Sequence, residues 1–119
     1  MKLVNLENKI KLSELEEMST KMYDSLVKAV IDISNNTMVV DAQMHADQEK
    51  FLLEQGSYQG TLWGINLYPE FYGEDDFIEF DSMINIRPAH GNRSRSVEDE
   101  SIQEKIKETI NMLVENEVS

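Results

Sequence analysis

The segment 87–95 has the composition of an anion-binding loop. It contains three arginines and His90 but no acidic residue. Arginine contacts phosphate or carboxylate through paired hydrogen bonds, and Gly91 lets a backbone approach a ligand closely. The segment leads into a predicted helix, whose unpaired first amides and dipole favour an anion. We therefore expect a small anionic ligand or a protein partner to be held here by Arg87, His90, Asn92, Arg93 and Arg95.

The rest of the chain is strongly acidic. Its 119 residues include 23 Asp and Glu and 11 Lys and Arg, for a formal net charge of -12. Without the three arginines of 87–95, 8 basic residues remain against 23 acidic ones, which is a balance of -15. This charge argues against nucleic-acid binding through bulk charge. It also leaves an alternative open, in which the arginines pair with nearby carboxylates of the chain itself: Glu98, Asp99 and Glu100.

A second group of residues has the side chains of a divalent-metal site. Asp and His are competent metal ligands, and three of them lie close together where a predicted strand leads into a helix. Their spacing matches no established metal motif, and a helix cap by Asp41 or Asp47 is the simpler explanation. No sequence signal identifies any other cofactor. The candidate metal ligands are Asp41, His45, Asp47 and Asp81.

Alternate positions of the predicted strands form a polar sheet face. In the predicted strand 77–87, apolar residues share one side and polar residues share the other. Such a face could bind Mg²⁺ or Ca²⁺, or supply an acid and a base. It is also typical of an antiparallel sheet that exposes one face to water. The polar residues concerned are Asp32, Asp41, Asn66, Asp81, Asn85 and Arg87.

The first half of the chain carries local signals for a strand, a helix and a hairpin. A short strand is expected at 2–6. Ser13 and Glu16 have the spacing of a capping box, and they open a helix with apolar positions at Leu15, Met18 and Met22. Two β-rich runs, 27–33 and 37–42, are separated by a Ser-Asn-Asn sequence that suits a hairpin turn.

The second half adds two helices and two strands. A helix over 45–55 is expected to end at Gly56, and strands are expected over 61–68 and 77–87. Isoleucines at 102, 106 and 110 recur at helical spacing and predict a final helix. The order is β-α-β-β-α-β-β-α. It predicts a single α+β domain over 1–119, with a four- to five-stranded, mainly antiparallel sheet and three helices packed mainly on one face.

Composition excludes several classes of protein. The chain has no cysteine, which excludes disulfides, a thiol nucleophile and cysteine-based metal sites. No apolar run approaches the length of about 18 residues that spans a bilayer, and the N-terminus lacks the core of a signal peptide. We therefore expect a cytoplasmic protein with no membrane partner.

Several stretches resemble one family of small bacterial and archaeal proteins, catalogued only as a domain of unknown function. They are residues 38–42, 45–47, 62–70, 76–88 and 91–94, so the resemblance extends over about residues 25–114. The family resemblance implies a self-contained cytoplasmic domain. It implies no activity and no catalytic residue.

Three functions remain open from the sequence. The leading interpretation is a small binding domain whose 87–95 loop holds an anionic group. A hydrolase of a phosphate-containing substrate is the first alternative, with Arg93 and Arg95 on the phosphate and Asp41, Asp81 or His90 as acid, base or metal ligand. The second alternative is an acidic regulatory protein that docks on a basic partner. A homodimer formed through an exposed sheet edge is also compatible with the sequence.

Overall fold

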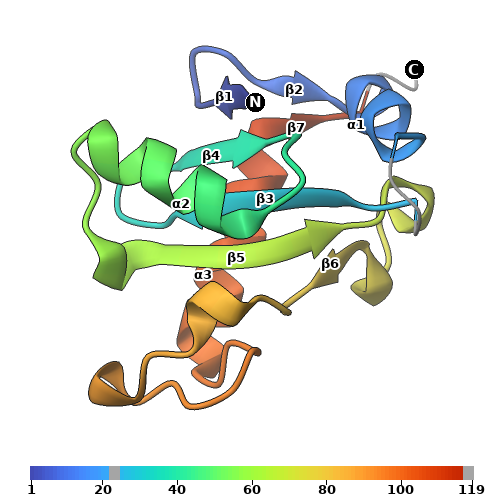
Figure 1. The fold of residues 1–119 in the computed structure, drawn as a ribbon. Coiled ribbons are helices and arrows are strands. Elements are labelled where there is room, and N and C mark those ends of the chain that lie inside the picture. The colour runs from blue at the N-terminus through green and yellow to red at the C-terminus, as the bar shows by residue number, and fades with distance from the viewer. Residues whose placement is uncertain (22–24, 117–119) are drawn as a thin grey trace.

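A five-stranded antiparallel sheet forms the centre of the fold, in a computed structural model that describes residues 1–21 and 25–116. The strands are β1 Lys2–Val4, β2 Ile10–Lys11, β3 Val27–Asp32, β4 Thr37–Val40, β5 Leu62–Leu67, β6 Ile78–Glu79 and β7 Val114–Glu115. The order in the sheet is β1-β4-β3-β5-β6, and every neighbouring pair is antiparallel (Figure 1). The strands β2 and β7 form a separate parallel pair that ties the two ends of the chain together.

Three α-helices and several short 3₁₀ helices connect these strands. The α-helices are α1 Leu12–Ser19, α2 His45–Glu54 and α3 Glu100–Leu113. The 3₁₀ helices are η1 Gln59–Thr61, η2 Pro69–Phe71, η3 Asp75–Phe77, η4 Met83–Asn85 and η5 Pro88–His90. The predicted order of elements is confirmed, with β2 and β7 as additions. These two strands are only two residues long, which is too short for a periodic sequence signal.

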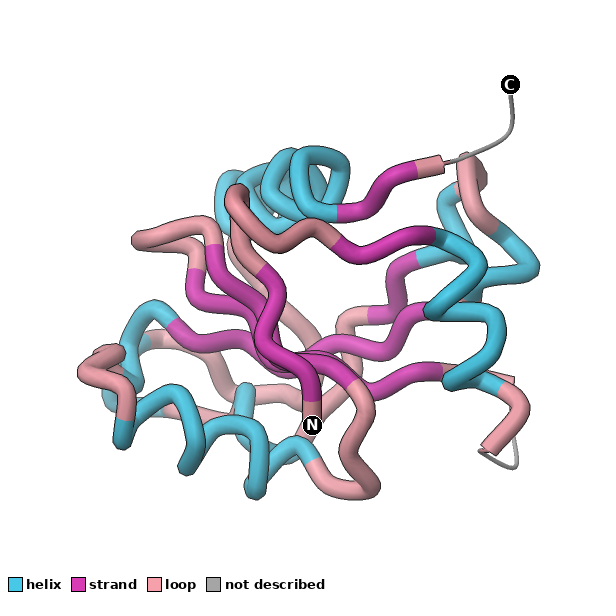
Figure 2. The backbone as a smooth tube through the Cα atoms, turned by 90° about the horizontal axis from the view of Figure 1, so that it is seen from above, coloured by secondary structure: helices cyan, strands magenta, loops and turns pink. Residues whose placement is uncertain are grey.

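Helices cover both faces of the sheet (Figure 2). Alternate residues of β5 point to opposite sides, so Trp63 and Ile65 join a core cluster with Ile106 of α3. Leu62 joins a smaller cluster with Leu52 of α2. The helix α1 contributes to the same cluster as α3. The predicted α+β class is confirmed, with α1 and α3 on one face. The expectation that the other face is open to water is wrong, because α2 and Ile84 of η4 pack against it.

Most local signals for turns and helices are confirmed. Asp32 pairs with Thr37 across the predicted hairpin, and Asn36 takes the left-handed conformation with φ of 54°. The helix α2 begins at His45 and is followed by Gly56 at φ of 101°, as its sequence predicts. In the apolar stripe of α3, Ile106, Ile110 and Leu113 are buried and Ile102 is partly buried.

The predicted start of α1 is wrong by two residues, because a cap at Ser13 would make Glu14 the first helical residue. The helix begins at Leu12, and Lys11 precedes it without a side-chain cap. Lys11 belongs to β2, whose pairing with β7 carries the chain directly into the helix and leaves Ser13 inside the first turn. The predicted apolar position Met22 lies outside the described residues.

The predicted long strand 77–87 is broken after β6. Beyond Glu79 the chain turns across the sheet, and the side chain of Asn85 takes the place of a strand beside Gly64. The Gly64 amide donates to Asn85 Oδ1 at 2.8 Å, and Asn85 Nδ2 donates to the Gly64 carbonyl at 3.0 Å. Gly64 also leaves room for Ser82 above it. A side-chain contact therefore replaces the ladder that the apolar alternation suggested.

We predict that Gly64→Ala destabilises the protein by about 1–3 kcal/mol, as overpacking of a core does. A Cβ atom at this position would lie 2.5 Å from the Cβ of Ser82, so one of the two chain segments must shift. Urea unfolding followed by circular dichroism measures the change. Gly60→Ala is the matched control, because its Cβ would meet only the His90 ring, with Cε1 at 3.7 Å and Nδ1 at 3.9 Å, which are ordinary contacts. Equal stability of the two variants would contradict the close approach of Ser82.

Candidate functional site

Arg87, the first residue of the predicted anion loop, is held by the protein itself. Its side chain is buried, and its guanidinium carbon lies 4.2 Å from the ring centroid of Trp63. The guanidinium donates to the carbonyl oxygens of Gln59 and Leu62, the latter at 2.7 Å. Burial lowers the pKa of Arg87, and the charge of Glu49 opposes this shift. Arg87 therefore links Gln59 and the first residue of β5 to the loop.

Asn92 organises the backbone of the same loop. Its Nδ2 donates to the carbonyls of Asn85, Ser94 and Ser96 at 2.8, 3.1 and 2.7 Å. Its Oδ1 accepts from the Glu98 amide at 2.9 Å. Asn92 is 4% exposed, so these bonds use the whole side chain inside the protein. Both residues were predicted to contact an anion, and in the described structure they hold the loop together.

The sequence predicted an anion at the start of α3. In the structure, two carboxylates of the protein itself accept hydrogen bonds from the backbone amides at this helix start and in the loop before it. Asp99 Oδ1 accepts from the amides of Ser101 and Ile102, at 2.8 and 3.4 Å. The Glu98 carboxylate accepts from the amides of Arg93 and Ser94, both at 2.8 Å. These hydrogen bonds, from Ser101 to Asp99 and from the Arg93 backbone to Glu98, lower the pKa of both carboxyl groups.

A cavity of about 320 Å³ lies between this helix start and the loop. Arg87 and His90 contribute basic groups to its wall, and Glu98 and Asp99 contribute acidic ones. The two carboxylates therefore offset the positive charge of Arg87. The side chains of His90 and Arg93 are exposed at the tip of the loop. This side of the loop has no surplus of positive charge for an anion.

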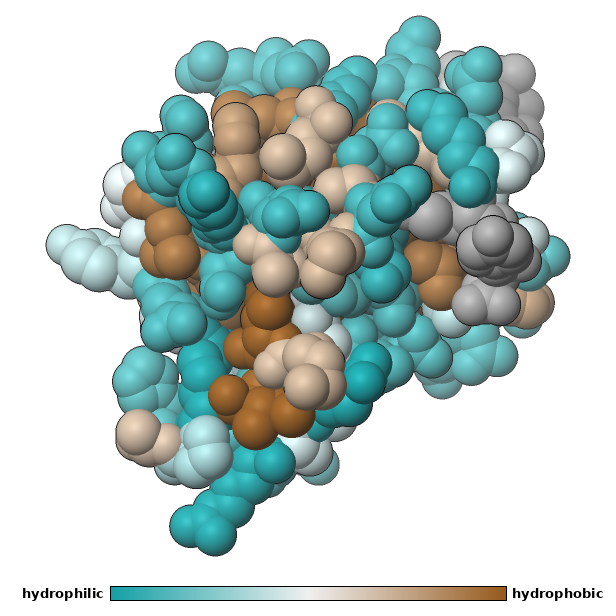
Figure 3. Space-filling view, viewed as in Figure 1, coloured by the Kyte–Doolittle hydropathy of each residue, from teal (hydrophilic) through white to brown (hydrophobic). Residues whose placement is uncertain are grey.

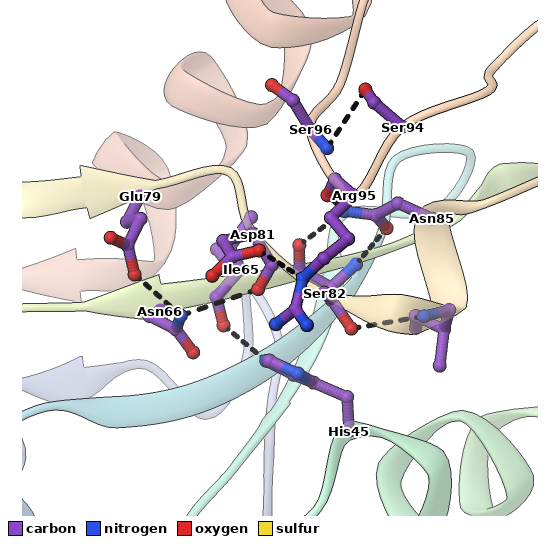
Figure 4. Close-up of polar contacts among 12 residues, drawn as sticks. His45, Ile65, Asn66, Glu79, Asp81, Ser82, Asn85, Ser94, Arg95 and Ser96 are labelled. Atoms are coloured by element: carbon purple, nitrogen blue, oxygen red, sulfur yellow. Dashed lines mark hydrogen bonds and ion pairs between the residues drawn. The ribbon is translucent and has the colours of Figure 1, made fainter.

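Arg95, the last residue of the loop, faces the other side of the segment, toward α2. Its Nε lies 2.6 Å from Asp81 Oδ1, which fixes the guanidinium in place (Figure 4). The terminal nitrogens of Arg95 make no hydrogen bond within residues 1–21 and 25–116. Arg95 borders a cavity of about 160 Å³, which we call the His45–Arg95 cavity. Its walls are Lys28, Met44, His45, Ala46, Ser82, Met83, Ile84 and Arg95.

Both apolar and basic side chains surround the His45–Arg95 cavity. Met44 and Met83 at its border are exposed by 57% and 65%. Figure 3 shows apolar side chains at the surface over η4, next to α2, with polar side chains around them. The basic groups of Lys28, His45 and Arg95 come from three different segments. None of the described residues that line the cavity is acidic.

His45 is the first residue of α2, and its ring is fixed by the sheet. Its Nε2 lies 2.7 Å from the carbonyl oxygen of Ile65 (Figure 4). Because a carbonyl oxygen only accepts, Nε2 must carry the hydrogen. Burial lowers the pKa of His45; the bond to Ile65 acts against that shift, as does Asp81, whereas Lys28 and Arg95 add to it. The ring is therefore neutral near pH 7, with a lone pair on Nδ1.

The start of α2 has no cap of its own. Met44 precedes the helix and offers no side-chain acceptor to the first amides. The first amides of a helix lack intrahelical partners and carry the positive end of the helix dipole. Met44, His45 and Ala46 all border the His45–Arg95 cavity, so this end of the dipole lies at its wall.

The polar residues of the expected sheet face do not converge on one point. Asp32 accepts hydrogen bonds from Ser34 and Ser57, both at 2.6 Å, and thereby joins two loops. Burial acts to raise the pKa of Asp32, but these hydrogen bonds outweigh it and the pKa lies below its usual value. Asn66 donates to Glu79 at 2.8 Å, and Asn85 bonds to Gly64.

The predicted metal ligands are only partly brought together. His45 lies near enough to Asp81 and Arg95 for both charges to affect its pKa, and Asp81 is bonded to Arg95. Asp41 instead contacts Lys21 at 3.5 Å. Asp47 is exposed in the first turn of α2. Among the described residues, no three His, Asp or Glu side chains form a group that could hold a metal ion. The metal site stays a prediction.

The sequence did not single out Lys28 or Ser82 as site residues. Lys28 alternates with buried residues of β3, which indicates its sheet face but not its neighbours. Ser82 reaches the cavity because the chain turns after β6, where the sequence predicted a continuous strand. Arg95 and His45 were both predicted as site residues, but in two separate sites.

Comparison with known families gives one match. Residues 4–113 match the family described as Protein of unknown function (DUF5674). The chain belongs to this family. The match confirms the resemblance to a family without an assigned function. No curated protein and no solved structure matches the chain. Of the helices in 1–21 and 25–116, none is both long enough and apolar enough to cross a membrane.

The role of Asn92 gives a prediction of stability. Asn92→Ala leaves three carbonyls and one amide without their partner, and we expect a loss of about 1–3 kcal/mol in the free energy of unfolding. Urea unfolding measures it. Arg93→Ala, one residue away and exposed, is the control and should change stability by less than about 0.5 kcal/mol. An Asn92→Ala protein as stable as the unaltered chain would contradict the role of Asn92 in holding the loop.

Proposed function

We propose that this chain is a small binding domain that holds an anionic group in the His45–Arg95 cavity. The observation that carries the proposal is that Lys28, His45 and Arg95 border one cavity with no acidic residue among its described walls. The chain has about twice as many acidic as basic residues, 23 against 11, so this local excess of basic groups is unusual.

The geometry favours an anion for three physical reasons. Lys28 and Arg95 supply positive charge, and hydrogen bonds from charged donors to an anion are roughly twice as strong as neutral ones. The uncapped start of α2 adds unpaired amides and the positive end of a helix dipole. Asp81 bonds to Nε of Arg95, so the terminal nitrogens of the guanidinium stay available to donate to a ligand.

The proposal places the anion on a different side of the loop from the one that the sequence favoured. Of the residues predicted to bind an anion, Arg95 borders the His45–Arg95 cavity. Arg87 and Asn92 hold the loop, and His90 borders the cavity on the α3 side. The carboxylates of Glu98 and Asp99 on that side would repel an anion.

The other functions stay predictions. A hydrolase of a phosphate-containing substrate would need Arg95 and Asp81 in one site, and these two side chains do lie 2.6 Å apart. Asp41 and His90, two other residues of that hypothesis, lie away from the His45–Arg95 cavity. The acidic regulatory protein with a basic partner, the homodimer and the cytoplasmic location also stay predictions.

Anion binding is tested by calorimetric titration with inorganic phosphate, sulfate and acetate. We expect the chain to bind at least one of these anions, and Arg95→Gln to weaken that binding about tenfold or more, because a hydrogen bond to a charged group contributes about 1.5–3 kcal/mol. Arg93→Gln removes the same charge two residues away and should leave the affinity within about twofold, since exposed charges at a distance are screened.

Two results would contradict the proposal. One is the absence of binding for all three anions. The other is an equal loss of affinity in Arg95→Gln and Arg93→Gln, which would show that the anion responds to overall charge and not to the His45–Arg95 cavity.

A further inference from the structure

His45 adds a ring nitrogen with a lone pair to the wall of the His45–Arg95 cavity, whereas the charged groups of Lys28 and Arg95 can only donate. The His45 side chain is 9% exposed, and its Nε2 hydrogen is directed to Ile65. Its Nδ1 has no hydrogen-bond partner among the residues that the structure describes. A neutral imidazole with hydrogen on Nε2 presents a lone pair at Nδ1, which requires a donor.

We infer that the His45–Arg95 cavity selects an anion that carries a proton, namely hydrogen phosphate, over a fully deprotonated anion such as sulfate. This inference rests on the proposed function, because it concerns the same cavity. Both anions are tetrahedral, similar in size and doubly charged above neutral pH. They differ in one respect that matters here: hydrogen phosphate has an O–H group and sulfate has none.

Hydrogen phosphate has two kinds of oxygen, charged oxygens and one hydroxyl, and the groups around the cavity can pair with both kinds. Lys28, Arg95 and the first amides of α2 donate to its charged oxygens. The lone pair of His45 accepts from its hydroxyl. A sulfate ion in the same position would place a charged oxygen against that lone pair, and a buried acceptor without a donor opposes binding. The volume of about 160 Å³ corresponds to roughly five water molecules, which is room for a phosphate group.

The charges around His45 keep its ring in the accepting state. Burial of the ring is the main effect that disfavours a second proton and so lowers the pKa of His45, and the charges of Lys28 and Arg95 add to it. Asp81 acts in the opposite direction, but its carboxylate is bonded to Arg95. On α2 itself, the charged neighbours are Asp47 and Glu49. The result of these effects is a pKa below the usual value of about 6.5 for histidine.

The test is a calorimetric comparison of inorganic phosphate and sulfate at about pH 8, where His45 is neutral. We expect phosphate to bind at least about tenfold more tightly than sulfate, as sites that pair with a ligand hydroxyl reject analogues without it. A phosphate monoester, which is mostly a dianion without a P–OH group at this pH, should behave like sulfate. The monoester titration therefore shows whether the cavity prefers free phosphate or the phosphate group of a phosphorylated molecule.

His45→Gln is the matched variant. A glutamine amide can replace Nε2 as donor to the Ile65 carbonyl, but it lacks the acceptor at the Nδ1 position. The ratio of phosphate to sulfate affinity should fall toward one in this variant, and a thermal unfolding curve confirms that it is folded.

The outcomes separate the inference from the proposed function. Equal affinities for phosphate and sulfate at pH 8, both dependent on Arg95, would overturn the selectivity and leave anion binding intact. A preference for phosphate that persists in His45→Gln would also overturn it. Binding of neither anion, nor of acetate, would overturn both.

Discussion

The pairing of Asn85 with Gly64 is the contact on which the arrangement around the loop depends. The strand β6 pairs with β5 over only two residues, and the edge of β5 beyond them would be left without partners. The buried amide of Asn85 supplies one donor and one acceptor to Gly64, in place of a strand. The same Nδ2 also donates to the Arg95 carbonyl at 2.9 Å, so a single side chain joins β5 to both ends of the loop.

This pairing decides which way each arginine faces. The segment before Asn85 crosses the α2 face, where Ser82 packs against Gly64 and its amide donates to the Arg95 carbonyl. Arg95 is thereby brought beside α2, next to Lys28 and His45. Arg87 follows on the other side and stacks on Trp63. The basic charge that the sequence concentrates in one loop is divided between two faces, and only the face toward α2 has no acidic residue in its described wall.

Local structure was more predictable from the sequence than the site. Helical spacing in α3, the Asn-rich turn after β3 and Gly56 after α2 are short-range signals, and the structure confirms each of them. The break after β6 could not be predicted, because the alternation around Ile84 and Ile86 is also that of a strand and the Asn85 contact spans 21 residues. Lys28 and Arg95 border the same cavity because of tertiary structure. Such an arrangement leaves no periodic pattern in the sequence, so it could not be predicted either.

The most direct test of the account is a titration of the ¹⁵N-labelled chain with inorganic phosphate, followed by amide chemical shifts. Binding in the His45–Arg95 cavity predicts that the largest shifts occur at His45 and Ala46, at the uncapped start of α2, and at Arg95. Shifts confined to the start of α3 near Ser101, or the absence of shifts at α2 on saturation, would contradict the location of the site.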